Sequence, residues 1–266
     1  MRIFPAIAIL VFGTVFPRGA PQRQEDFKAY ARSLEMARKE LARRPGSPAL
    51  LGVLAGVHER SGNYGAAIEV LSDAVSKHPR RADLLLRLGS CNLGKLDYLA
   101  AVEANTRAVS LTPREKSAPA RLSLARALAG LGKHAEAVGE LKLVIELGLE
   151  SAQVFYSLAE AQDGLARSLR GPGGAPEAVA LDKEAIAALE RAILFDPAHR
   201  SANYLLGRLL LRSGRKEEGK KTLERFRALQ RSNEEGKRQA FSEKMERSSS
   251  RLEADTALEL ARVRRE

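Results

Sequence analysis

The stretch from Pro48 to Arg81 decides the fold, and it reads PALLGVLAGVHERSGNYGAAIEVLSDAVSKHPRR. Leu and Ala recur in its first half at three- and four-residue spacing, which is typical of one face of a helix. Gly62 predicts a turn, and a second helical pattern then continues until Pro79 ends it. The stretch therefore predicts two helices of similar length joined by a tight turn.

The same pattern returns along most of the chain. Pro45, Pro79 and Pro113 lie 34 residues apart, and Ala67 and Ala101 repeat with the same interval. Small residues at recurring places allow two helices to cross closely, while Leu fills the space between neighbouring units. We therefore expect an all-α array of stacked helix pairs, with about five units.

The repeats divide the chain into parts. Residues 1–20 are predicted to be a signal peptide or anchor, residues 21–46 a leading helix or degenerate half-repeat, residues 47–230 the array, and residues 231–266 a charged C-terminal helix or tail. The fourth unit carries an insertion at about 165–180 with a glycine- and proline-rich turn. We expect its helices to extend about two turns past their neighbours, as a finger about 10 Å long.

The C-terminal part is charged and helix-prone. Phe241 and Met245 lie four residues apart and are predicted to dock this part as an end cap of the array. The run Ser248–Ser250 interrupts the pattern. Beyond Ser250 we expect a frayed or independent helix rather than a packed one, as is common at chain termini.

The N-terminus carries an apolar segment. Arg2 precedes the run Ile3–Phe16, and Ala20 suits the position before a cleavage site. A short basic start followed by an apolar run of this length is typical of a secretory signal. Arg18 is unfavourable for cleavage, so an uncleaved membrane anchor is the alternative. The sequence therefore predicts export to a periplasmic or secreted location, with membrane association if the segment is retained.

Residues that carry chemistry do not converge in the sequence. The four histidines are scattered, and the lone Cys91 excludes an internal disulfide and a cysteine-based zinc site. The glycine-rich run Gly130–His134 lacks the leading glycine and the Ser or Thr of a phosphate-binding loop. The sequence therefore predicts no catalytic, cofactor or metal site, and a protein that is not an enzyme.

The chain is basic, with 44 Lys and Arg against 33 Asp and Glu. Such a balance is compatible with an acidic protein, an anionic lipid or a nucleic acid as partner, and also with a solvated surface of mixed charges. Nucleic-acid binding favours a basic face interleaved with aromatic residues, and aromatics make up only 5% of this chain. We therefore do not expect nucleic acid as the partner.

The units resemble tetratricopeptide repeats over about residues 48–230. Each places Leu or Phe, a small residue, a turn glycine, a second small residue and often a terminal proline at that family's spacing. The resemblance implies a right-handed α-solenoid whose first helices line a concave groove. It also implies that this groove binds extended or helical peptides.

The family's groove-facing positions can be carried over to this sequence. The first unit has Ala49, Gly52 and Gly56 there, so its groove face is expected to be nearly bare and the distinctive surface to lie in later units. Leu86 and Leu122 can equally be read as core residues of their units. The predicted protein-binding residues are Leu86, Leu122, Arg126, Tyr156, Glu160, Tyr204 and Arg208.

These observations predict a non-catalytic interaction scaffold in the cell envelope, which binds a protein or peptide through its groove. The first alternative is a membrane-tethered assembly factor whose basic surface lies on anionic lipid. The second is nucleic-acid binding. The sequence identifies neither the partner nor the oligomeric state.

Overall fold

The computed structural model describes residues 21–171 and 176–265, and the side chains of residues 28–171, 176–233 and 252–263. All regular structure in this part of the chain is helical. The α-helices are α1 (Pro21–Arg43), α2 (Pro48–Arg60), α3 (Tyr64–Lys77), α4 (Ala82–Gly94), α5 (Tyr98–Leu111), α6 (Ala118–Gly130), α7 (His134–Glu146), α8 (Ala152–Leu169), α9 (Pro176–Phe195), α10 (Arg200–Arg212) and α11 (Lys216–Arg265), with a short 3-10 helix at Arg114–Lys116.

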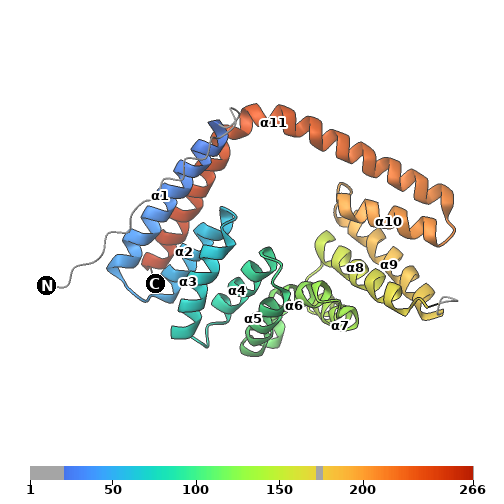
Figure 1. Cartoon of the computed structure of the whole chain (residues 1–266), viewed down its shortest axis with the longest axis horizontal. Helices are drawn as coiled ribbons and strands as arrows, with labels where there is room; N and C mark the ends of the chain where they lie inside the picture. The colour runs from blue at the N-terminus through green and yellow to red at the C-terminus, as the bar shows by residue number, and fades with distance from the viewer. Residues whose placement is uncertain (1–20, 172–175, 266) are drawn as a thin grey trace.

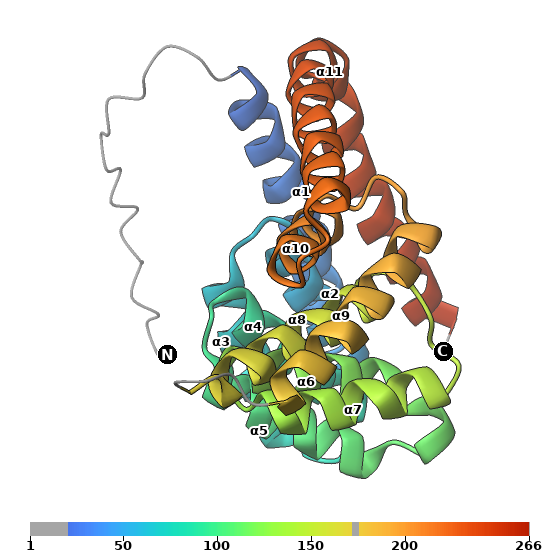
Figure 2. The same ribbon diagram turned by 90° about the vertical axis from the view of Figure 1, so that its right-hand side faces the viewer.

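The helices stack in pairs along an arc (Figures 1 and 2). Each helix packs on the one that follows it, and the first helices of successive pairs, α2, α4, α6, α8 and α10, also neighbour one another. The predicted all-α solenoid of helix-turn-helix units is confirmed. Its first helices therefore form one continuous inner surface, which positions the candidate site.

Local chemistry sets where these helices begin and end. Asn63 and Asp97 accept hydrogen bonds from the backbone N–H groups of Ala66 and Ala100, so each side chain caps the first turn of a second helix. Gly62 has a φ of 75°, the left-handed conformation that a helix C-terminus commonly needs and that glycine adopts without a Cβ clash. The turn predicted at Gly62 is thus present.

The core follows the predicted placement of small residues. Gly89 of α4 shows why they are needed, because a Cβ there would collide with the side chain of Asn105 on α5. Larger side chains such as Leu71, Leu141 and Phe155 fill the space between helices and are fully or almost fully buried. The alanines at the recurring positions are completely buried: Ala55, Ala67, Ala101, Ala125, Ala137, Ala159 and Ala185.

The fourth pair is longer than its neighbours. Helix α8 has 18 residues and α9 has 20, whereas α6 and α7 have 13 each. The expected lengthening of both helices around the insertion is therefore present. The tip of the finger, residues 172–175, lies outside the described residues.

The C-terminal helix differs from the expectation. Helix α11 is one element of 50 residues that leaves α10, crosses the open side of the arc and ends beside α1 and α2 (Figure 1). Leu260 is 4% exposed and belongs to a core cluster with Leu50, Leu54 and Val57 of α2. The expectation that the chain beyond Ser250 is frayed or independent is wrong.

The reason for this difference is distance along the chain. The residues that Leu260 contacts lie some two hundred positions earlier in the chain, so no local sequence pattern near Ser250 predicts these contacts. The predicted docking residues Phe241 and Met245 have side chains outside the described set. What anchors the segment in the described part is its last turns.

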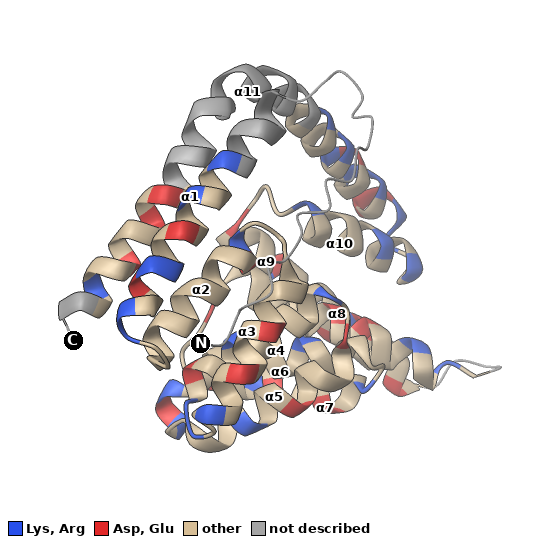
Figure 3. Ribbon diagram, turned by 60° about the vertical axis from the view of Figure 1, so that its left-hand side comes forward, with Lys and Arg blue, Asp and Glu red and all other residues tan. Residues whose placement is uncertain are grey.

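The end of α11 runs in the same direction as α1. Arg32 in the middle of α1 pairs with Glu253, and Arg44 just after the end of α1 donates to the backbone oxygen of Val263. Charged residues of both signs gather where the two helices lie side by side (Figure 3). This segment packs on both α1 and α2 and so covers the leading unit.

The apolar run Ile3–Phe16 lies outside the described residues, so the predicted signal or anchor is not tested. None of the described helices is both long enough and apolar enough to cross a membrane.

Candidate functional site

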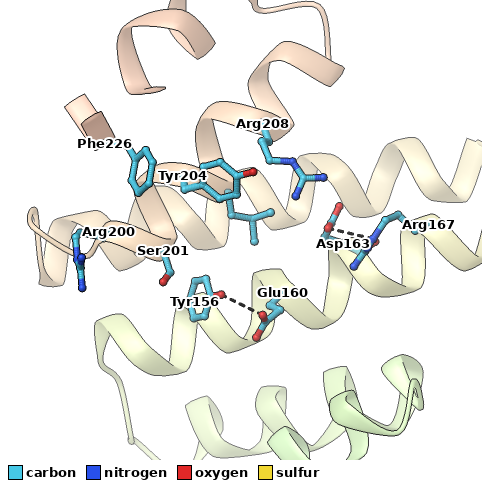
Figure 4. Close-up of a pocket in the computed structure, with 10 residues that line it drawn as sticks. Tyr156, Glu160, Asp163, Arg167, Arg200, Ser201, Tyr204, Arg208 and Phe226 are labelled. Carbon is cyan, nitrogen blue, oxygen red and sulfur yellow. Dashed lines mark hydrogen bonds and ion pairs between the residues drawn. The ribbon is translucent and has the colours of Figure 1, made fainter. Parts of the chain in front are cut away.

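The inner surface of α8 and α10 forms a hollow of about 510 Å³ (Figure 4). Four of the seven predicted site residues line it, two from each helix. They are Tyr156 and Glu160 of α8 and Tyr204 and Arg208 of α10. The structure thus brings together side chains that are up to 52 positions apart in the sequence.

Tyr156 and Glu160 stand one helical turn apart on α8. The Tyr156 hydroxyl donates a hydrogen bond to Glu160 Oε1 at 3.0 Å. Burial, and then the negative charge of Glu160, raise the pKa of Tyr156 to about 12. The tyrosine ring also lies against the His199 ring, with 5.1 Å between centroids. These contacts hold Tyr156 in one orientation, and its ring forms one wall of the hollow.

The opposite wall comes from α10 and the start of α11. The Tyr204 ring packs against Phe226 at 5.2 Å between centroids, and the Arg208 guanidinium lies 5.7 Å from the Tyr204 ring centroid. Tyr204 remains 44% exposed. Arg200 and Arg208 have no ion pair with a carboxylate among the described residues. The wall thus offers an aromatic surface and two available guanidinium groups.

Asp163, which lines the hollow, belongs to a buried charge network that links α8, α9 and α10. Asp163 and Asp182 are 3% and 5% exposed, and Arg212 of α10 bridges both with bonds of 2.5 Å. Arg167 pairs with Asp163 at 3.3 Å, and Arg170 pairs with Asp182. Burial lowers the pKa of Arg212, but its bonds to Asp182 and Asp163 outweigh this and raise it. Both buried carboxylates are therefore paired with arginines of the protein itself.

Sequence reasoning missed this network. Arg212 lies 49 and 30 positions from Asp163 and Asp182, so helical spacing does not connect them. A weak signal exists, because both aspartates fall in phase with buried residues of their helices, where an unpaired charge would be unfavourable. That signal indicates that a cationic partner is needed but does not identify it.

A second hollow of about 350 Å³ continues the surface toward α6. Arg126 lines it, and Glu160 and Arg167 line both hollows, so the two join along α8. Arg126 is exposed and has no ion pair within the described set. The groove across α6, α8 and α10 therefore contains five of the predicted residues.

The other two predicted residues lie elsewhere. Leu122 is half-buried and packs against the core cluster that α6 shares with α8. Leu86 lines a separate hollow of about 550 Å³ between α2, α4 and the end of α11, and also packs on the core of the first units. A role in binding stays a prediction for all seven residues.

The groove face of the first unit is not bare, contrary to the expectation. The Arg87 side chain of α4 lies over it and donates to the backbone oxygen of Gly52 at 2.5 Å. A Cβ at Gly56 would collide with the same guanidinium group. Glu259 and Val263 of α11 line the hollow beside it. Here the glycines make room for the protein's own side chains.

Metal-binding and thiol chemistry find little support in the described residues. No group of three or more His, Cys, Asp or Glu residues could hold a metal ion there. Burial raises the pKa of the Cys91 thiol to about 12, so it stays protonated at neutral pH and packs as a small apolar residue.

Comparison with known proteins agrees with this geometry. Two family models described as tetratricopeptide repeat match the sequence, at residues 48–91 and 183–238. The chain therefore contains tetratricopeptide repeats in these two stretches. The two matches lie at opposite ends of the array, at α2 to α4 and at α9 to α11. None of the curated proteins matches the sequence significantly.

Several solved repeat structures share the fold. MamA from Desulfovibrio magneticus RS-1 superposes with a TM-score of 0.58 at 19% identity, over 70% of this chain and 97% of that one. YrrB, described as a TPR protein with an unusual peptide-binding site, has a TM-score of 0.55 at 16% identity, over 74% and 93%. TTC0263, a thermophilic TPR protein of Thermus thermophilus, has a TM-score of 0.52 at 19% identity, over 71% and 99%. At these identities the likeness establishes the fold.

Proposed function

We propose that this tetratricopeptide-repeat protein is a non-catalytic scaffold that binds an acidic segment of another protein in the groove across α6, α8 and α10. The observation that carries the proposal is the set of unpaired arginines there. Arg126, Arg200 and Arg208 face the groove without a carboxylate partner in the described residues. A guanidinium group holds a carboxylate with two parallel hydrogen bonds, so these groups fit aspartate and glutamate side chains.

The aromatic rings supply the other part of the recognition. Tyr156 and Tyr204 offer flat surfaces for apolar side chains, and each is held by a neighbouring ring. Preorganised side chains lose little conformational entropy on binding, which favours affinity. The expected ligand is therefore a segment with alternating acidic and apolar residues, in extended or helical conformation.

The binding of peptides by a similar fold supports this proposal. YrrB is described as carrying an unusual peptide-binding site, and it shares the stacked helix pairs of this chain. The groove of this protein has its own set of side chains. We expect the binding specificity to come from these arginines and tyrosines rather than from the fold.

The test is selection of a random peptide library on the immobilised protein, followed by affinity measurement of the enriched peptides. Enrichment of Asp and Glu next to apolar residues is expected. The double change R126E/R208E should weaken binding at least about 100-fold, since each charge-assisted hydrogen bond contributes about 1.5–3 kcal/mol and two arginines are lost.

The matched control is R107E/K183E, which changes net charge equally. Both residues are exposed on second helices, α5 and α9, away from the groove lining. The control should bind as the unaltered protein does. Peptides without acidic enrichment, or equal losses in the two double variants, would contradict the proposal.

We further propose that the protein works in the cell envelope, on the basis of Arg2 and the apolar run Ile3–Phe16. N-terminal sequencing of the protein from membrane and soluble envelope fractions tests this. A new N-terminus near Ala20 supports an exported soluble scaffold, whereas an intact Met1 in the membrane fraction supports the tethered alternative. Recovery of the intact chain in the cytoplasm would contradict export.

A further inference from the structure

The interface between the end of α11 and the leading unit packs α11 against both α1 and α2. Among the described residues at the end of α11, Leu260 and Thr256 are buried in this interface. The described ion pairs flank them, with Arg60 on Glu259 at 3.1 Å and Arg32 on Glu253 at 3.0 Å. The two sides of this interface therefore come from opposite ends of the chain.

The receiving surface belongs to the leading unit. Leu50, Val53 and Val57 of α2 project toward α1 and bury against Ala37 and Leu260. Without the end of α11, these apolar side chains would lack part of their cover, at a cost of about 25 cal/mol for each Å² of apolar area. The leading unit thus needs a helix of this pattern, whichever chain supplies it.

The path of α11 allows its end to dock either on its own first unit or on that of a second copy. A straight helix of 50 residues is about 75 Å long, at 1.5 Å per residue. Figure 1 shows α11 turning between α10 and α1 so that it returns to its own first unit. Sharp bends in helices usually need proline or a weak point such as Gly or Ser clusters, and residues 216–265 contain Gly236 and Ser248–Ser250 but no proline.

From these observations we propose that the end of α11 is exchanged between two copies of this chain, giving a domain-swapped dimer. When α11 straightens, residues 252–263 leave their own α1 and α2 and dock on those of a second copy. The contacts of Leu260, Glu253 and Glu259 are the same in both forms, so the exchange costs no interface energy. It also removes the bend.

The exchange has a consequence for the inner surface. Glu259, Arg262 and Val263 line the hollow at its α2 and α4 end. In the swapped form the same residues come from the partner copy. The dimer therefore joins two arrays through their first units, while the groove across α6, α8 and α10 stays free in each.

Charge exchange across the interface provides the test. The variant R32E/R60E changes the receiving side, and the variant E253R/E259R changes the end of α11. Each alone places like charges at both ion pairs. Mixed together, the two variants restore every pair only if the helices are exchanged, because each receiving surface then meets the matching α11. The fourfold variant restores the pairs within one chain and is the control.

The expected result is a mixture whose mass by light scattering is about twice that of the monomer, with one copy of each variant shown by mass spectrometry. The fourfold variant should match the unaltered protein. A mixture that stays monomeric while the fourfold variant regains the stability lost in its parents would overturn the proposal.

A second measurement does not depend on weakened variants. The chain R32C/E253C/C91A carries two accessible thiols across the interface, since the native Cys91 is buried and is removed. Treatment with a short bismaleimide at increasing protein concentration should give a rising fraction of covalent dimer. Internal crosslinks alone at every concentration would show that α11 closes within one chain.

Discussion

The two halves of the inner surface share one helix-pair plan and differ in what covers them. In the first half, Gly52 and Gly56 leave room that Arg87 fills, and the end of α11 lies beside it. In the second half, Tyr204 and Arg208 face a hollow that no other part of the described chain occupies. The same backbone therefore yields one half that is occupied by the protein itself and one that is available.

Position in a repeat does not by itself identify a binding residue. A glycine at a groove position suggests an empty surface in the sequence. In the structure it can instead leave room for a long side chain from the next helix, as Arg87 shows. An arginine at the same kind of position is available only when no carboxylate lies within reach. Arg208 meets this condition among the described residues, and Arg212 does not.

The largest expected effect falls on the second half. R212M should lower the free energy of unfolding by about 3–5 kcal/mol, because it leaves two buried carboxylates without their shared cation. Chemical denaturation measures the loss. The triple variant D163N/D182N/R212M should recover most of the loss. R87M, in the first half, should cost about 1 kcal/mol at most, because the Glu59 side chain that pairs with Arg87 is 33% exposed and keeps access to water. Equal losses of stability in R87M and R212M would contradict the proposed difference between the two halves of the inner surface.

The next effect concerns the first half. L260A should lower the free energy of unfolding by about 2–4 kcal/mol, since Leu260 is buried against α2. L258A makes the same change on the same helix at a side chain that is 56% exposed, and should cost less than about 0.5 kcal/mol. Hydrogen exchange of residues 252–263 shows whether the loss is local. Similar costs for the two variants would mean that the end of α11 does not hold the first half.

The smallest effect is a titration in the second half. Because the pKa of Tyr156 is raised above its ordinary value to about 12, the folded protein keeps a proton that the unfolded chain loses near pH 10. The stabilisation is complete below about pH 10 and is lost as the pH rises to about 12. E160Q should lower the pKa of Tyr156 but leave it above the ordinary value, since burial is the larger cause.

Tyrosinate absorbance, followed in the unaltered protein, in Y156F and in E160Q, checks this titration. The Y156F spectrum identifies the contribution of Tyr156 among the five tyrosines. An unchanged curve in E160Q would show that Glu160 does not influence the hydroxyl that it faces.

Much of the architecture was within reach of sequence reasoning. Helix pairs, turn glycines such as Gly62, buried alanines at recurring places and the longer fourth unit all follow from helical periodicity and from the repeat along the chain. The groove positions of Tyr156, Glu160, Tyr204 and Arg208 followed from the same phase and meet in one hollow. Leu122, which is half-buried against the core, shows the limit of this reasoning. Position in the helical repeat alone does not separate a groove residue from a core residue.

The repeating unit is encoded locally, since each helix pair is specified by side chains that belong to the same unit, such as Gly89 and Asn105. Which surfaces remain free depends on contacts between distant units. Arg212 reaches Asp163 from 49 positions away, and the end of α11 returns to Arg32 from 221 positions away. Such contacts depend on how the stacked units curve and where a long helix ends, and those outcomes arise only when all the units are packed together.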